Sequence, residues 1–557
     1  MAIHVARQNT RKIRVLCNIS YEKHKRAVRA QRSHIGVILS HTAVCVGTDV
    51  ALRQDDPALH ASCVVATNPI KSYLPRHGKK WFSQRRMKCT FCKKKGHAYN
   101  FCPAKPYRPL KTNPFVESVL AAKRVNTNAF HKMDLRDALA QIKSAGEPLN
   151  EGNPWARSDK IYDRLRARLG FWRAIGASDA VISWLGYGVP MTFTRPPSHV
   201  AFENHKMEEH MIQYVNEDMQ KRIESKCFKR AQPGQVKICN PILVIEQKGK
   251  LRRCDDARYP NAYLASPSFA LPSIKKDVPL LIDEDTTQIS KDLKDAYYQV
   301  PLAEEAQPFM AFAWLGILYI TLVMLFGMCQ APFFFTRICK PIVRLFGALK
   351  HPSLNYIDDW LWSVRNSGYD DLRAFISELF ELLGWRFNNK GQSGTRVEFL
   401  GFIIDSVKRM IFVSDKKVSA LSTNIKELQL AAAANERIKV SKLCSVIGSA
   451  MSMYDAIPSV RVWCRELYTH MYKGSNHVFL SREACEELDT LVWLLNFRNG
   501  NPFLSPAHDD EVWVDSGEVG WGLTFNGMME KGQFPAQVIG TSSTFRELYG
   551  LWLALSS

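Results

Sequence analysis

The sequence predicts an α+β protein of several domains with a small metal-binding module near its N-terminus. The chain has 557 residues, 46% of them hydrophobic, which is enough to bury a large core. Helical and strand-like runs alternate over residues 200–405, and residues 406–500 look mostly helical. Cysteine and histidine cluster within residues 81–110 at metal-ligand spacing.

Six segments follow from these patterns. They are a basic region that is poorly ordered or forms a small module (1–80), the Cys/His module with its linker (81–110), a helical connecting region (111–195), a mixed region (196–405), a mostly helical region (406–505) and a short strand-rich region (506–557). Apolar spacing predicts helices around Asp134 to Lys143, Asp159 to Ile175, Lys416 to Ala434 and Ser441 to Met453.

The positive charge is concentrated at the N-terminus. The formal net charge is +22, and residues 1–110 hold 22 Lys and Arg against 4 Asp and Glu. A basic arm of this kind indicates a partner that carries many phosphate groups. The alternative is a solvated tail that only keeps the protein soluble. Fourteen cysteines are too few for a disulfide scaffold, and no signal peptide is apparent, so we expect the cytosol or the nucleus.

An uncharged run from Ala306 to Thr336 is long enough to span a bilayer. Gly316, Gly327 and Pro332 interrupt it, and its β-branched and aromatic residues suit two buried strands and a turn. We therefore predict no membrane insertion.

A metal motif with the spacing C-x2-C-x4-H-x4-C lies in the basic arm. Its ligands are Cys89, Cys92, His97 and Cys102. Three thiolates and one imidazole complete a tetrahedral Zn²⁺ site without an open position, so the zinc is expected to be structural. Aromatic and basic neighbours suit stacked bases and phosphates. The nucleic-acid-binding candidates are Phe91, Tyr99, Arg85, Arg86, Lys93, Lys94 and Lys95. The segment resembles the retroviral-type zinc knuckle of nucleocapsid proteins.

Two acidic motifs predict a second metal centre. Asp358 and Asp359 stand between apolar stretches, and a hairpin tip there would let both reach one metal cluster. Asp292 stands at the end of an earlier strand-like run. Carboxylates from separate strands are what two-metal phosphoryl transfer requires, with Mg²⁺ or Mn²⁺ as the ion.

The region from about 190 to 405 resembles a reverse transcriptase, with six motifs in the family order. The resemblance implies a right-hand polymerase of fingers, palm and thumb, whose palm is a small antiparallel sheet packed on helices. It also implies that Asp292, Asp358 and Asp359 are catalytic and bind Mg²⁺. Lys390, in the motif beginning at Gly384, matches a candidate general acid for the leaving pyrophosphate.

The same resemblance assigns the residues that hold the nucleotide. Arg252 would bind the triphosphate, assisted by Lys248 or Lys250, while Asp256 and Arg258 brace the fingers. Tyr297 would stack under the deoxyribose and exclude a 2′-hydroxyl. Phe326 and Gly327 match the motif that shapes the nucleotide pocket, although Leu325 stands where the family has proline. The implied partners are an RNA template, a DNA primer, dNTPs and element RNA.

The last 50 residues resemble the opening half of an RNase H domain. Asp515 on a strand and Glu547 at a helix start match two of its metal-binding carboxylates. The Asp-Ser-Gly triplet at 515–517 is also that of aspartic proteases, but the residues that follow it favour RNase H. Because the further carboxylates are absent, we expect no RNase H activity from the chain as given.

Residues 437–502 and the stretch from Gly186 to Pro190 resemble DIRS-like retrotransposons, and Gypsy-type LTR elements are the competing assignment. The sequence therefore predicts an RNA-directed DNA polymerase of a retrotransposon. The alternatives are a catalytically decayed relic that still binds nucleic acid and, more weakly, a Gag-like structural protein.

Overall fold

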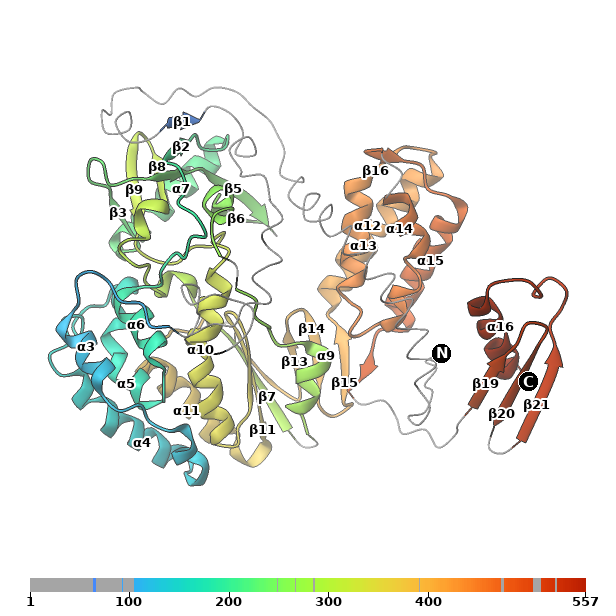
Figure 1. Ribbon diagram of the computed structural model, residues 1–557, viewed down its shortest axis with the longest axis horizontal. Helices are drawn as coiled ribbons and strands as arrows, with labels where there is room; N and C mark the ends of the chain where they lie inside the picture. The colour runs from blue at the N-terminus through green and yellow to red at the C-terminus, as the bar shows by residue number, and fades with distance from the viewer. Residues whose placement is uncertain are drawn as a thin grey trace. The chain divides into compact units, whose positions relative to one another are not determined.

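The computed structural model describes residues 64–66, 93, 105–247, 249–265, 267–283, 286–389, 391–471, 475–503, 512–525 and 528–556. The chain divides into two compact units (Figure 1), and the described residues fall within 64–503 and 512–556. The expectations for residues 1–80 and for the zinc ligands lie outside the described residues, apart from strand β1 (Val64–Ala66).

A helical layer begins the larger unit. Its α-helices are α3 (Pro114–Ala121), α4 (Leu135–Gly146), α5 (Leu169–Ala174) and α6 (Asp179–Tyr187). The Asp134 side chain accepts a hydrogen bond from the Asp137 N–H, so α4 begins at an N-cap acid. The helix expected from Asp159 is wrong in its first half, which forms two 3₁₀ turns. There the Asp163 carboxylate accepts hydrogen bonds from Ser158 Oγ and Lys226 Nζ.

A six-stranded sheet follows, with the order β1-β2-β4-β8-β9-β3. Its other strands are β2 (Val200–Phe202), β3 (Phe228–Arg230), β4 (Ile238–Asn240), β8 (Ala311–Trp314) and β9 (Ile317–Thr321). The uncharged run supplies β8 and β9, whose turn residues Leu315 and Gly316 both have positive φ angles, as a tight hairpin requires. The prediction of buried strands is confirmed, and no helix in the described parts of the chain is long and apolar enough to cross a membrane.

Two buried arginines near this sheet have charged or aromatic partners. Helix α7 (Glu209–Glu224) carries Arg222, which donates to the Asp295 carboxylate at 2.9 Å. The Arg253 guanidinium lies over the Phe228 and Phe312 rings, with its carbon 4.5 and 4.1 Å from the ring centroids. Buried cations need such partners because desolvation is costly.

The central sheet is antiparallel, with the order β10-β11-β7-β12. Its strands are β7 (Thr286–Asp292), β10 (Ser353–Tyr356), β11 (Asp359–Arg365) and β12 (Gln392–Gly394). Helices α10 (Ala331–Ala348) and α11 (Tyr369–Leu382) pack on it through aromatic contacts, such as Phe346 with Trp362 and Trp360 with Phe380. Trp172 of the helical layer donates to the Leu383 carbonyl, so one core runs through both layers. The structure therefore contains an antiparallel sheet covered by helices, as was expected for this region (Figure 1).

A second core lies in the rest of the larger unit. The sheet β13-β14-β15-β18 comprises Arg396–Phe399, Phe402–Asp405, Met410–Val413 and Asn501–Pro502. The helices are α12 (Asp415–Ala433), α13 (Val440–Met451), α14 (Arg465–Met471) and α15 (Arg482–Phe497). The two helices predicted from the apolar spacing at 416–434 and 441–453 are therefore confirmed as α12 and α13, within two residues at either end.

The smaller unit is a three-stranded antiparallel sheet and one helix. Its elements are β19 (Val512–Ser516), β20 (Gly520–Phe525), β21 (Met528–Gln533) and α16 (Ser543–Ser556). Gly550 of α16 lies so close to β19 that an added Cβ would come within 2.5 Å of Ser516 Oγ.

Candidate active site

Three aspartates meet where β7 ends and the β10–β11 hairpin turns. Asp292 is the last residue of β7, and Asp359, the first of β11, is its cross-strand partner. Asp358 lies in the hairpin turn, and its carbonyl accepts a hydrogen bond from the Leu293 N–H at 2.9 Å. Neighbouring antiparallel partners lie about 5 Å apart, so the register alone brings two of the acids together.

The turn that presents Asp358 is strained. Ile357 has a φ angle of +59°, a left-handed conformation that β-branched residues rarely adopt. The Asn355 side chain donates to the Ile357 carbonyl at 2.7 Å and holds the turn. Such strain costs on the order of 1–3 kcal/mol and is found mainly at functional sites.

The aspartates oppose each other's ionisation. Burial, followed by the charges of Asp358 and Asp292, raises the pKa of Asp359 to about 7. Burial and the Asp292 charge also raise the pKa of Asp358, whereas Arg252 acts to lower it. In the part of the chain that the structure describes, no three Asp, Glu, His or Cys side chains form a group that could hold a metal ion. In donor type and charge, however, the three carboxylates fit Mg²⁺ or Mn²⁺, which prefer oxygen ligands.

The raised pKa of Asp359 predicts a pH-dependent stability of the metal-free protein. The folded state holds this proton more tightly than the unfolded chain, so its stabilising effect is complete below pH 3.8 and is lost as pH rises through about 7. Asp359→Asn removes the effect. In EDTA, we expect the variant to become more stable than the parent protein between pH 5 and pH 8, measured by urea unfolding at each pH. A stability difference that does not change with pH would contradict this assignment.

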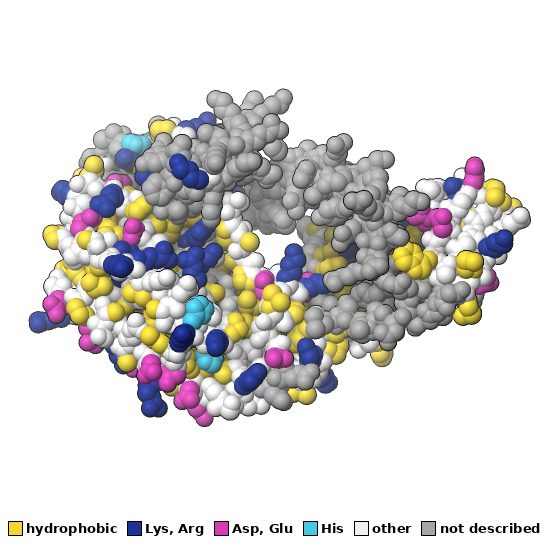
Figure 2. Space-filling view, turned by 60° about the horizontal axis from the view of Figure 1, so that its bottom comes forward, with side chains coloured by type: hydrophobic (Ala, Val, Ile, Leu, Met, Phe, Trp, Pro, Cys, Tyr) yellow, Lys and Arg dark blue, Asp and Glu magenta, His cyan; other side chains and the backbone are white. Residues whose placement is uncertain are grey.

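The nucleotide-binding candidates of the fingers lie on one hairpin. Strands β5 (Ile242–Gln247) and β6 (Lys250–Asp255) pair along their length, and Arg252 and Lys250 on β6 are exposed. Because Arg252 influences the pKa of Asp358, its charge acts on the aspartate site. Lys248 lies outside the described residues. Figure 2 shows Lys and Arg side chains gathered near the middle of one face of the larger unit.

Asp256 and Arg258 form the brace that the sequence suggests. The Arg258 guanidinium donates hydrogen bonds to both oxygens of the Asp256 carboxylate, at 2.6, 2.8 and 3.0 Å. Hydrogen bonds from His205 and Arg258 outweigh burial and hold the pKa of Asp256 down at about 2. Asn261, which closes the D-x-R-x-x-N motif of Asp256 and Arg258 but received no role from the sequence, donates to the Gly327 carbonyl and accepts from the Cys329 N–H. It therefore clamps the loop that carries Phe326.

Tyr297 and Phe326 lie together, as the pocket assignment requires. Their ring centroids are 4.8 Å apart, and Phe335 supports Tyr297 at 5.4 Å. Tyr297 is buried, and burial together with the Asp358 charge raises its pKa, so its hydroxyl stays neutral. Gly327 has a φ angle of +101°, and an added Cβ would lie 2.6 Å from the Asp255 carbonyl oxygen.

Asn388 was also missed by sequence reasoning. Its side-chain amide donates to Asp292 Oδ2 at 2.6 Å. The only signal in the sequence is its position two residues before Lys390, which itself lies outside the described residues.

The Cys/His metal motif lies in a part of the chain that the structure does not describe. Its four ligands and neighbouring basic and aromatic residues lie outside the described residues, with the exception of the exposed Lys93.

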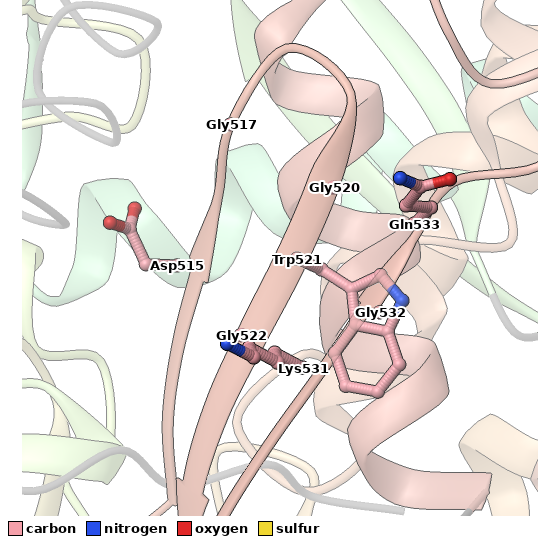
Figure 3. Close-up of a pocket in the computed structure, with 8 residues that line it drawn as sticks. All are labelled: Asp515, Gly517, Gly520, Trp521, Gly522, Lys531, Gly532 and Gln533. Carbon is pink, nitrogen blue, oxygen red and sulfur yellow. The ribbon is translucent and has the colours of Figure 1, made fainter.

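Asp515 and Glu547 lie on elements that pack together in the smaller unit. Asp515 is on β19 and Glu547 is in the first turns of α16, and Ser516 Oγ donates to the Arg546 carbonyl between them. Figure 3 shows the Asp515 carboxylate pointing away from the Trp521 ring, with which it lines a shallow pocket.

Comparison with known proteins gives a family match over the region that holds these residues. Residues 246–404, which include Arg252 and all three aspartates, match the family described as "Reverse transcriptase (RNA-dependent DNA polymerase)". An uncharacterized protein of Caenorhabditis elegans is 31% identical over 201 residues, 34% of this chain. A polyprotein of Commelina yellow mottle virus is 33% identical over 122 residues, 22% of this chain. The chain spans only 15% and 6% of the lengths of these two proteins.

Among solved structures, the chain is similar to a foamy viral protease–reverse transcriptase in complexes with nucleic acid. One complex with double-stranded DNA shows 13% identity and a TM-score of 0.46, covering 81% of this chain and 74% of that one. A complex with an RNA/DNA hybrid shows 14% identity and a TM-score of 0.47, covering 83% and 58%.

Proposed function

Because residues 246–404 match the model of the reverse transcriptase family, we propose that this protein is an RNA-directed DNA polymerase of a retroelement. The observation that carries the proposal is the pairing of Asp292 with Asp359 on adjacent strands, with Asp358 in the turn between β10 and β11. Burial and the charges of neighbouring aspartates raise the pKa values of Asp358 and Asp359, and carboxylates with raised pKa values are frequent at functional sites.

The three aspartates would hold two divalent ions and direct an in-line displacement. When bound, Mg²⁺ or Mn²⁺ would activate the primer 3′-hydroxyl and neutralise the pyrophosphate leaving group. Arg252 binds the triphosphate with its planar fork of donors. The buried Tyr297 ring packs against Phe326 and Phe335, and we propose that it excludes a ribose 2′-hydroxyl. Lys390 is proposed as the general acid from its motif position alone.

The experiment that tests this function is nucleotide incorporation on poly(rA) primed with oligo(dT), in Mg²⁺. We expect dTTP to be incorporated and UTP to be strongly disfavoured, because Tyr297 excludes the 2′-hydroxyl. A folded protein that binds this primer–template but adds no nucleotide would instead be a nucleic-acid-binding relic.

We further propose that Cys89, Cys92, His97 and Cys102 form a zinc knuckle that binds element RNA. The support is their spacing within the basic arm. We expect Cys92→Ser to abolish binding of one zinc per chain and to weaken RNA binding about tenfold, measured by metal analysis and filter binding at fixed salt. Cys329→Ser, at an exposed cysteine of the larger unit, is the control. Equal zinc content in both variants would refute the knuckle.

We also propose a type of retroelement, a role for two carboxylates of the smaller unit and a cellular location. The motifs at 186–190 and 437–502 support a DIRS-like element over a Gypsy-type one. Asp515 and Glu547 are proposed as metal-binding carboxylates of an RNase H-like fold, because α16 packs beside β19. A cytosolic or nuclear location is proposed from the sparse cysteines and the nucleic-acid partners.

A further inference from the structure

Residues 386–388, which follow α11, pair with the last residue of strand β7 and the two residues after it. The Lys294 N–H donates to the Arg386 carbonyl, and the Asn388 N–H donates to the Asp292 carbonyl, both at 2.8 Å. Between them, Leu293 and Phe387 form an antiparallel bridge. The backbone of residues 386–388 is therefore fixed against the residues that follow the first catalytic aspartate.

Phe387 anchors this segment from the other side. Its ring lies 4.5 Å from that of Phe380 and 6.3 Å from that of Trp362, and Lys291 Nζ lies 4.8 Å from its centroid. Since Phe380 and Trp362 are buried in the core, the segment is tied to the sheet and to α11 together. Small displacements of Asn388 are restricted on both sides.

The Asn388 side chain uses this fixed backbone to reach Asp292. Its Nδ2 donates to Asp292 Oδ2 at 2.6 Å, while its own N–H holds the Asp292 carbonyl. One residue therefore binds both the backbone and the carboxylate of Asp292. An amide is also neutral, so it orients the carboxylate without adding a positive charge that would compete with a metal cation.

We propose that Asn388 is a positioning residue that holds the Asp292 carboxylate in the orientation for metal binding. The proposal rests on the proposed function of the aspartate site. The hydrogen bond from the Asn388 amide to Asp292 Oδ2 opposes rotation of that carboxylate. Hydrogen bonds to metal ligands of this kind contribute about 10–100-fold in metal affinity or activity.

The test compares Asn388→Ala with Asn389→Ala in the full chain. Asn389 is an exposed residue of the same type at the next position. Mn²⁺ binding is measured by electron paramagnetic resonance with a bound primer–template, and Asp358→Asn identifies the ions that belong to the aspartate site. We expect Asn388→Ala to weaken this binding about 10–100-fold, and Asn389→Ala to leave it unchanged. Affinity for the primer–template in EDTA stays the same in both.

Kinetics separate positioning from a general structural role. For Asn388→Ala, we expect the Mg²⁺ concentration at half-maximal incorporation to rise by the same factor, with most of kcat recovered at saturating Mg²⁺. A structural defect would lower kcat at every Mg²⁺ concentration. If Asn388→Ala does not fold, Asn388→Ser, which keeps the backbone hydrogen bond to Asp292 and carries a hydroxyl, is assessed by the same measurements.

Two results would overturn the inference. One is Mn²⁺ affinity within twofold of the parent protein in the folded Asn388 variant. The other is that the Asp358→Asn variant binds as much Mn²⁺ as the parent protein. A parent protein that binds Mn²⁺ through Asp358 but incorporates no nucleotide would refute the proposed function alone, and the Mn²⁺ comparison would still decide the role of Asn388.

Discussion

We expect Asp358→Asn to lower the rate of dTMP incorporation by at least about a thousandfold, which corresponds to about 4 kcal/mol of transition-state stabilisation. Asn keeps the size of Asp358 and can keep the turn, because Asn355 and Leu293 bond to backbone carbonyls at Ile357 and Asp358. The substitution removes one of the three charges that would hold the metal ions. The measurement is single-turnover extension of a labelled primer on an RNA template.

The matched control is Asp370→Asn, an exposed acid in the first turn of α11. It makes the same chemical change outside the site, so incorporation is expected to stay within twofold of the parent rate. A folded Asp358→Asn protein that keeps a tenth of the parent activity would mean that this aspartate does not bind a catalytic ion.

Gly188→Ala is expected to cause the largest loss of stability, about 3–5 kcal/mol. Gly188 has a φ angle of +97°, and an added Cβ would lie 2.4 Å from the Leu302 carbonyl carbon and the Ala303 nitrogen. These atoms cannot move aside easily, because the Val189 N–H and carbonyl are hydrogen-bonded to Pro301 and Ala303. The methyl group would force apart the end of α6 and the strand-like segment it pairs with.

Gly234→Ala separates strain of the backbone from steric overlap. Gly234 has a φ angle of +73°, but nothing lies within 4 Å of an added Cβ, so we expect a loss of only about 1 kcal/mol. Urea unfolding followed by tryptophan fluorescence measures both variants. Equal midpoints for the two would show that the overlap at Gly188 is relieved without cost.

The features that the sequence predicts correctly depend on local patterns. Apolar spacing identifies α12 and α13 because each buries one face against the second core. The uncharged run is correctly predicted as strands because glycine and proline interrupt it. Asp292, Asp358 and Asp359 were found because strand ends and hairpin turns can be recognised from neighbouring residues, and the register of β7 with β11 then brings the acids together.

What the sequence did not reveal depends on contacts between distant segments. Asn388 meets Asp292 across 96 residues, and Asn261 meets Gly327 across 66, so neither partner is visible from local spacing. Local spacing also predicted a helix from Asp159, but Lys226, 63 residues away from Asp163, contributes to its 3₁₀ conformation. Only in the segment after Asp159 does the structure depart from the helix that local spacing predicts, and tertiary context can override such a local preference.

The central claim is that the three aspartates catalyse RNA-templated DNA synthesis. It is tested most directly by extending an oligo(dT) primer on poly(rA) with dTTP and Mg²⁺, using the parent chain and Asp358→Asn side by side. The account predicts extended primer with the parent chain and none above background with the variant. A folded parent chain that binds the primer–template without extending it, or equal extension by both proteins, would contradict the account.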